Sequence, residues 1–291
     1  MSAIALDTAP STRPRFGDWA AGAFLLPITI VSLIGFIAPV AKLLVLSFQK
    51  AEATGALTGG FSLETWTSVL TDPFYLHLIL NSIGTSLLIT FLTLVASYPI
   101  ALYIHRIRGV QRSILLVLVI SPLLLSAVVR TYGWIAILAD GGLISRSLAY
   151  VLAEPPRLVF SLTGVVIGLT EILMPYMILA LLAGFGRLQD SAEEAALTLG
   201  ATPFTVFRRV VLPLSLPGVA LGSLLCFVLA VSSFITPKLL GGGRVFLLAT
   251  EIYDQTIVSL NWPVAATLSS MILVIFGTAL VFYTRLLRRL G

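Results

Sequence analysis

The sequence predicts an all-α integral membrane protein with six transmembrane helices. Of its 291 residues, 58% are hydrophobic and only 11% are charged, and the mean hydropathy is +1.03. Soluble domains usually carry about a quarter charged residues, so this composition excludes an ordinary soluble domain. The apolar residues also gather into six runs, each long enough for the roughly 20 residues that a spanning helix needs.

The expected domains follow from these runs. Residues 1–19 are polar and form an N-terminal tail, and the run that follows them is too long for a signal-peptide core, so we expect it to be retained. Residues 20–291 form one transmembrane domain. The expected spanning helices are 20–48, 76–104, 114–138, 159–185, 216–236 and 264–287. The connections 49–75, 139–158 and 237–263 contain glycine pairs and short amphipathic pieces, which predict small helices outside the spans.

The distribution of lysine and arginine predicts the orientation, because cytoplasmic loops carry the excess of these residues. With the N-terminus inside, most of the basic side chains fall on the cytoplasmic side, so we expect both termini there. The residues concerned are Arg13, Arg15, Arg106, Arg108, Arg112, Arg187, Arg208, Arg209, Arg285, Arg288 and Arg289. The same assignment places the connection between the fourth and fifth spans in the cytosol.

That connection, residues 190–213, has the pattern of two short helices joined by a glycine. Ser191 followed by Glu194 is a capping box, which predicts a helix that runs to residue 199. Gly200 can then adopt the left-handed conformation that ends a helix. Thr202 followed by Pro203 predicts the start of a second helix, and we expect Pro213 to end it. The alternative is that these residues only cap helices and contact no partner.

The spacing within this segment is Glu194-Ala195-Ala196, three residues, Gly200, nine residues, Val210, one residue, then Leu212-Pro213. It resembles the signature of the permease subunits of ATP-binding-cassette importers, with Val210 in place of the commoner isoleucine. The resemblance implies a type I importer permease fold, multi-pass in the bacterial inner membrane. It also implies that this elbow is the coupling helix, which sits in a cleft of the ATPase subunit.

Three further stretches narrow the resemblance to the first of two permease subunits of spermidine/putrescine-type importers, within a group that handles polyamines, opines and phosphonates. The stretches are residues 129–134 with 141–144, 173–179, and 234–242. The resemblance implies four kinds of partner: an ATPase dimer, a second permease of similar fold, an extracytoplasmic binding protein and the membrane lipid. It places ATP and Mg²⁺ on the ATPase subunits, so we expect no cofactor and no catalytic residue in this chain.

A polyamine is a long cation, and its ammonium groups favour carboxylates and aromatic faces. Glu171 lies near the middle of the fourth run, where an unpaired carboxylate is costly, so it is a candidate for the substrate path. It could instead pair with Arg130 or hydrogen-bond as a protonated acid. The external acids Asp140, Glu251 and Asp254 are further candidates.

Tyr132, Trp134 and Tyr176 could line a path for a cation, although such aromatic side chains also pack between helices. Arg130 could extend to the outer interface. If it faces the cavity instead, it would favour a carboxylate or phosphonate substrate. A polyamine is therefore the first expectation, and an opine, another amino-acid derivative or a phosphonate is the alternative.

Other classes fit less well. An ion-coupled secondary transporter would need several acidic residues in its spans and often inverted repeats, whereas Glu171 is the single acid there. An intramembrane enzyme would need clustered nucleophile partners, and the two histidines fall on opposite sides of the membrane. No Gly-x-x-x-x-Gly-Lys-Ser/Thr motif occurs, and Cys226 is the single cysteine, so neither a nucleotide site nor a thiolate metal site is expected. The basic residues form no stripe, which argues against nucleic acid.

Overall fold

The computed structural model describes residues 16–51, 57–149, 157–188 and 190–290. The chain divides into two units, Met1–Val45 and Leu46–Gly291. In the first unit, α1 (Phe16–Ser47) is one continuous helix that passes through Pro27 and Pro39. It begins before the expected residue 20, and residues 1–15 of the expected tail lie outside the described residues.

The connection 49–75 contains a small hairpin that the all-α expectation missed. Strands β1 (Gln49–Ala51) and β2 (Leu57–Phe61) are antiparallel, with Gln49 opposite Phe61. These strands are too short for their alternation of side chains to be recognised in the sequence. Helix α2 (Glu64–Thr71) follows, and Glu64 contacts Lys50 of β1 at 2.7 Å between Oε2 and Nζ. The hydrogen bond and the negative charge of Glu64 raise the pKa of Lys50 above its ordinary value of 10.5.

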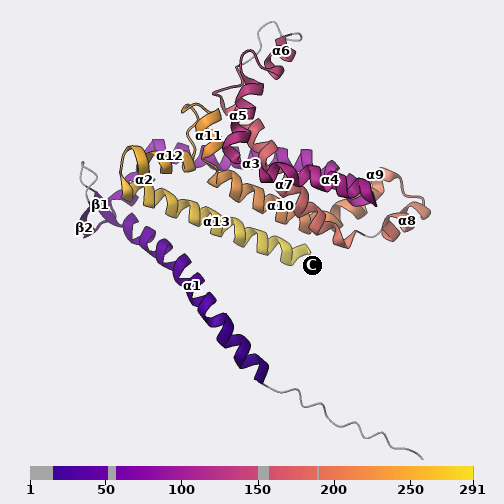
Figure 1. Cartoon of the computed structure of the whole chain (residues 1–291), viewed down its shortest axis with the longest axis horizontal. Helices are drawn as coiled ribbons and strands as arrows, with labels where there is room; N and C mark the ends of the chain where they lie inside the picture. Colours follow the sequence, from indigo (N-terminus) through magenta and orange to yellow (C-terminus); the bar gives the residue numbers. More distant parts are fainter. Residues whose placement is uncertain (1–15, 52–56, 150–156, 189, 291) are drawn as a thin grey trace, which may run out of the picture. The chain divides into compact units, whose positions relative to one another are not determined.

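Four helices lie side by side in the second unit (Figure 1). They are α3 (Pro73–Arg106), α7 (Leu162–Gly184), α10 (Leu212–Ser232) and α13 (Trp262–Leu290). Helix α7 is the most enclosed, because 61% of its apolar window is buried inside the chain. Its small residues allow close packing: an added Cβ on Gly184 would lie 2.2 Å from the Cα of Gly218 on α10. Gly184 and Gly218 therefore allow α7 and α10 to approach closely.

The third expected span is not one helix. Residues 110–138 form α4 (Val110–Ile120), the 3₁₀ helix η1 (Ser121–Leu124) and α5 (Ala127–Leu138). The chain breaks at Leu125, whose backbone is extended, and Ser126 then caps α5 by accepting a hydrogen bond from the Val128 N–H at 3.3 Å. The expectation of a continuous helix over 114–138 was wrong, because this serine starts a new helix. Among the described residues, six helical segments are nevertheless long and apolar enough to cross a membrane.

The connections 139–158 and 237–263 contain the expected short helices. Residues 139–158 include α6 (Leu143–Ala149). Residues 235–258 include α11 (Ile235–Leu240), α12 (Leu248–Tyr253) and the π-helical turn η4 (Asp254–Val258). At the opposite end of the bundle are the 3₁₀ helix η2 (Phe185–Arg187), α8 (Asp190–Thr198), α9 (Pro203–Val206) and the π-helical turn η3 (Phe207–Val211) (Figure 1).

Candidate functional site

The elbow formed by α8, Gly200 and α9 is built as the sequence predicts at its centre. Gly200 has a φ of +82°, in the left-handed region that glycine favours. The Gly200 N–H donates to the Leu197 carbonyl at 2.9 Å, and the Ala201 N–H donates to the Ala196 carbonyl at 3.1 Å. This pair of bonds is the Schellman arrangement, which ends α8 sharply. The predicted helix end at this glycine is confirmed.

The start of α8 differs from the prediction. The helix begins at Asp190, so Ser191 lies inside its first turn and is not the N-cap. The capping box of Ser191 and Glu194 is therefore wrong. Glu194 and Ala195 are exposed on α8, whereas Ala196 is half-buried. The charged group of Glu194 therefore lies beside the small exposed side chain of Ala195.

The second half of the elbow starts where expected and ends elsewhere. Thr202 caps α9 by accepting a hydrogen bond from the Thr205 N–H at 3.3 Å. Pro213 does not end the helix: α9, η3 and α10 form one helical segment, Pro203–Ser232. The π-helical turn η3 lies directly before Leu212 and Pro213, and the Leu212 N–H donates to the Phe207 carbonyl. Such a widened turn accommodates the proline ring and its missing N–H, so the prediction of a stop was wrong.

Two contacts attach the elbow to the bundle. Arg106, the last residue of α3, places its Nη2 atom 2.8 Å from Oε2 of Glu193 on α8. Glu193 has a side chain that is only 20% exposed, whereas its neighbour Glu194, the residue that the sequence pattern selected, is exposed. The sequence does contain a signal for Glu193, because a carboxylate in the segment 190–213 and an arginine at the end of a neighbouring spanning helix can form an ion pair.

An aromatic cluster forms the second contact. Tyr98 of α3 meets Phe185 of η2 and Phe207 of η3 edge to face, each with ring centroids 5.9 Å apart. Its hydroxyl also lies 2.9 Å from the Ser215 hydroxyl on α10. The ring of His105 contacts Phe185 at 5.5 Å. Both halves of the segment 190–213 therefore contact α3, through Glu193 and Phe207, and its second half continues into α10.

The elbow also leaves large apolar side chains uncovered. Leu199 is 89% exposed and Phe204 is 72% exposed, and Leu197 on α8 is 48% exposed. Apolar residues that gather at an exposed turn commonly mark a surface that another protein covers. This end of the molecule therefore exposes apolar side chains beside the charge of Glu194.

In the predicted substrate path, the structure brings together Trp134 and Glu171. The Trp134 Nε1–H on α5 donates to Oε2 of Glu171 on α7 at 3.0 Å. Glu171 does not pair with Arg130. Two guanidinium nitrogens of Arg130, Nε and Nη1, are buried without a hydrogen-bond partner among the described residues. Tyr132 is 58% exposed, and Tyr176 is half-buried on α7.

The predicted external acids lie in three different environments. Asp140 is exposed after α5. Glu251 on α12 is only 7% exposed and accepts a hydrogen bond from Gln255 Nε2 at 2.8 Å. Asp254 contacts Lys238 of α11 through both carboxylate oxygens. The sequence reasoning did not single out Lys238, although it stood in a stretch that carried the family resemblance.

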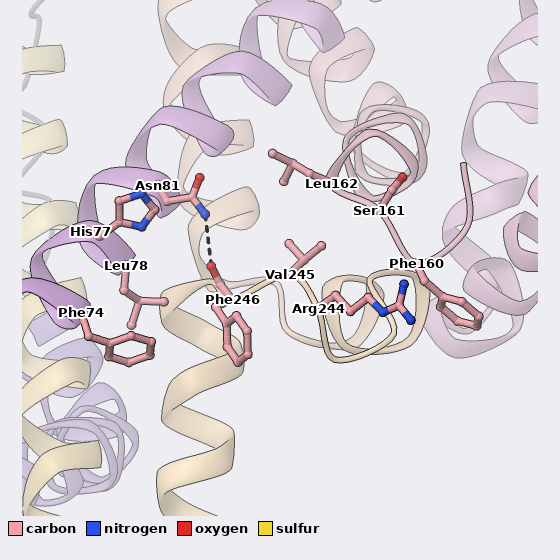
Figure 2. A pocket seen from close by; sticks show the side chains of 10 residues that line it. All are labelled: Phe74, His77, Leu78, Asn81, Phe160, Ser161, Leu162, Arg244, Val245 and Phe246. Carbon is pink, nitrogen blue, oxygen red and sulfur yellow. Dashed lines mark hydrogen bonds between the residues drawn. The ribbon is translucent and has the colours of Figure 1, made fainter. Parts of the chain in front are cut away.

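Figure 2 shows a pocket of about 370 Å³ between α3, the start of α7 and the connection that follows α11. Asn81 Nδ2 donates across it to the Phe246 carbonyl at 3.3 Å. His77 and Arg244 belong to its lining, and none of the 10 lining residues is acidic. This pocket therefore does not have the chemistry of an ammonium site. In the described part of the chain, no group of three or more His, Cys, Asp and Glu could hold a metal ion.

Comparison with protein families decides what kind of molecule this is. The model of the family described as "binding-protein-dependent transport system inner membrane component" matches residues 15–291. The chain belongs to this family. It is therefore a multi-pass inner-membrane permease component of a binding-protein-dependent transport system, and its six apolar helical segments agree with that assignment.

Similar curated proteins include the spermidine/putrescine transport system permease proteins PotB of Haemophilus influenzae and Escherichia coli. The first is 32% identical over 260 residues, which cover 88% of this chain and 91% of that protein. The second is 30% identical over 269 residues, covering 90% and 98% of the two chains. The permease YdcU of Escherichia coli is 30% identical over 231 residues, covering 75% of this chain and 74% of YdcU.

Solved structures of low identity share the fold. A chain of a bacterial alginate ABC transporter, in complex with a periplasmic protein that carries an alginate pentasaccharide, matches with a TM-score of 0.77. It is 17% identical, and the match covers 94% of this permease and 95% of that chain. A chain of the MetNI methionine ABC transporter matches with a TM-score of 0.53 at 15% identity, covering 76% and 100% of the two chains. The permease thus has the type I importer fold that the resemblance implied.

Proposed function

We propose that this permease belongs to an ATP-driven solute importer and that residues 190–213 couple ATP hydrolysis to transport. The observation that supports this proposal is the structure of the elbow. Its apolar side chains Leu199 and Phe204 are exposed, and it contacts α3 through the Arg106–Glu193 ion pair and the Tyr98 cluster. ATP and Mg²⁺ are bound by a partner ATPase dimer. A second permease subunit and an extracytoplasmic binding protein complete the transporter, and this chain supplies neither a cofactor site nor a catalytic residue.

In this proposal, closure of the ATPase dimer moves the elbow, and the elbow moves α3 and α10. The Arg106–Glu193 ion pair and the Tyr98 cluster connect α8 and η3 to those two helices. Because α9, η3 and α10 form one helical segment, part of the movement reaches α10 through the π-helical turn η3. Both chain termini and the elbow lie in the cytosol, as the distribution of arginine indicates.

The coupling role is tested by Gly200→Pro in the reconstituted transporter. Proline fixes φ near −65°, whereas Gly200 has a φ of +82° and its N–H donates to Leu197. We expect membrane insertion to persist, while substrate uptake and the stimulation of ATP hydrolysis by the binding protein are lost. Gly277→Ala is the control, because a Cβ at Gly277 has nothing within 4 Å. Normal uptake and normal stimulation in Gly200→Pro would refute the coupling role.

For the substrate, we propose a polyamine such as spermidine or putrescine. The support is the similarity to the PotB proteins and the carboxylates of Glu171, Glu251 and Asp254. An opine, another amino-acid derivative or a phosphonate is the alternative, and the buried guanidinium of Arg130 is the observation that would fit such an acidic substrate. Calorimetry on the cognate binding protein with spermidine, putrescine, an opine and a phosphonate distinguishes a polyamine substrate from an acidic one. Selective binding of an acidic ligand would refute the polyamine assignment.

A further inference from the structure

An ion pair between two short helices holds a lysine side chain in an unusually complete cation site. Nζ of Lys238 on α11 lies 2.5 Å from Oδ1 and 2.7 Å from Oδ2 of Asp254. The same nitrogen lies 5.7 Å from the centroid of the Tyr253 ring. Phe234 stacks on that ring at 5.5 Å and holds it in place. A carboxylate that accepts through both oxygens and an aromatic face are the two groups that bind an ammonium ion best.

The Lys238 side chain is chemically an aminobutyl group, four methylenes that end in an ammonium. Putrescine and one arm of spermidine contain the same group. The groups that hold Lys238 therefore match the end of such a molecule chemically, although a free ligand must also overcome the entropy of association, which the tethered side chain does not. The pair is also reachable from outside the protein, because the side chain of Lys238 is 36% exposed and that of Asp254 is 27% exposed.

An apolar pocket of about 380 Å³ adjoins these rings, within the range of about 300–1,000 Å³ that ligand pockets occupy. Phe234 and Tyr253 line it together with Thr256 and Ile257, and its remaining lining residues are Ser232, Ala249, Ile252 and Ile272. Asp254 and Lys238 are not among the lining residues, but Asp254 directly follows Tyr253 in the chain, so the hydrocarbon of a ligand held at Asp254 would have apolar side chains nearby. The pocket in Figure 2, with Arg244 and no acid in its lining, offers no such pairing.

We propose that Asp254 and Tyr253 form a binding site for a primary alkylammonium group, and that Lys238 occupies this site as a tethered competitor. Putrescine or another aminobutyl compound displaces Lys238, places its ammonium on Asp254 and lays its methylenes in the pocket beside Phe234. The identification of this ligand as the transported molecule rests on the polyamine function proposed above. The ammonium site itself rests only on the contacts of Lys238, Asp254 and Tyr253.

The competition sets the size of the expected effect. Partly exposed ion pairs contribute little free energy, so the state in which Lys238 is paired with Asp254 is only a few times more populated than the unpaired state. Removal of a competitor of this strength tightens the apparent affinity for an external ammonium by roughly two- to sixfold.

The experiment measures binding of n-butylammonium and putrescine to the full chain in lipid nanodiscs by calorimetry. Lys238→Met removes the competing charge and keeps the length of the side chain, so we expect the two- to sixfold gain. The double variant Lys238→Met with Asp254→Asn should lose all binding, and Lys238→Arg should bind no better than the wild type. Butanol, which has the same hydrocarbon and no charge, controls for apolar binding in the pocket.

Equal affinity in the wild type and in Lys238→Met would overturn the proposal, as would a gain that persists when Asp254 is replaced. If Lys238→Met does not fold, Lys238→Gln, which keeps a hydrogen-bond donor, replaces it in the same comparison. The result is independent of the substrate test. A binding protein that selects an acidic ligand would refute polyamine transport and leave the ammonium site standing, whereas polyamine transport with no gain in Lys238→Met would refute the site alone.

Discussion

The contact between Gly184 and Gly218 gives the most direct quantitative prediction. In Gly184→Ala, the new Cβ would lie 2.2 Å from the Cα and 2.6 Å from the N of Gly218, whereas ordinary contact begins at 3.4 Å. The obstacle is backbone, which cannot rotate away as a side chain could. Helices α7 and α10 would therefore have to separate by roughly an ångström, and overpacking of this kind costs about 1–3 kcal/mol.

We expect Gly184→Ala to lie at the upper end of that range, and Gly218→Ala below it. A Cβ at Gly218 would lie 2.9 Å from the Cα of Gly184. The measurement is the thermal unfolding midpoint of the purified chain in detergent. A loss of 2–3 kcal/mol should lower the midpoint by roughly 4–12 °C. Gly277→Ala again serves as the control, because it adds the same methyl group to a helix with no neighbour within 4 Å. Equal midpoints for Gly184→Ala and Gly277→Ala would refute the close contact between these two helices.

The remaining predictions concern the elbow and the buried polar groups. Arg106→Glu should reduce the ATP hydrolysis that the binding protein stimulates. It should change stability little, because the ion pair with Glu193 is partly exposed. The charge-reversed double variant Arg106→Glu with Glu193→Arg should restore the stimulated ATP hydrolysis. Trp134→Phe should lower the free energy of unfolding by about 1 kcal/mol, because Glu171 loses its hydrogen-bond donor. In a Glu171→Leu background the same substitution should cost less, and thermal midpoints measured in a double-mutant cycle test this difference. Arg130→Met should leave the unfolding midpoint unchanged or raise it, because it removes buried guanidinium nitrogens that have no partner among the described residues, and a large fall would contradict this.

Local chemistry explains why parts of the elbow were predictable from sequence. Gly200 and Thr202 act on their immediate neighbours, so a left-handed glycine and an N-cap can be recognised from a few residues. The continuation of the helix from η3 into α10 could not be predicted in the same way. A proline ends a helix unless the turn before it widens, and nothing in the residues around Pro213 distinguishes the two outcomes.

The candidate substrate residues show the limit of the same reasoning. The sequence showed that Glu171 is an acid inside an apolar run, and it suggested Arg130 as a partner from proximity in the fold. In the structure its partner is Trp134 on α5, a helix that starts after the break at Leu125, and the hydropathy of the run does not reveal that break. Lys238 was overlooked for a different reason. Its partner Asp254 lies on another helix, and the residues around either side chain do not indicate which helices will pair.

The helix Pro203–Ser232 connects the two ends of this permease at which we have placed a function. Its inner end is the elbow, with Thr202 as its cap and the Tyr98–Ser215 contact against its side. Its outer end is Ser232, which lines the pocket beside Phe234 and Tyr253. At 1.5 Å per residue, such a helix spans roughly 45 Å, more than the hydrocarbon thickness of a bilayer. The π-helical turn η3 is the place where its hydrogen-bond pattern changes, so bending there would let the elbow move without displacing the outer pocket by the same amount. A bend at η3 would therefore reduce a large movement of the elbow to a smaller one at the pocket beside Phe234 and Tyr253.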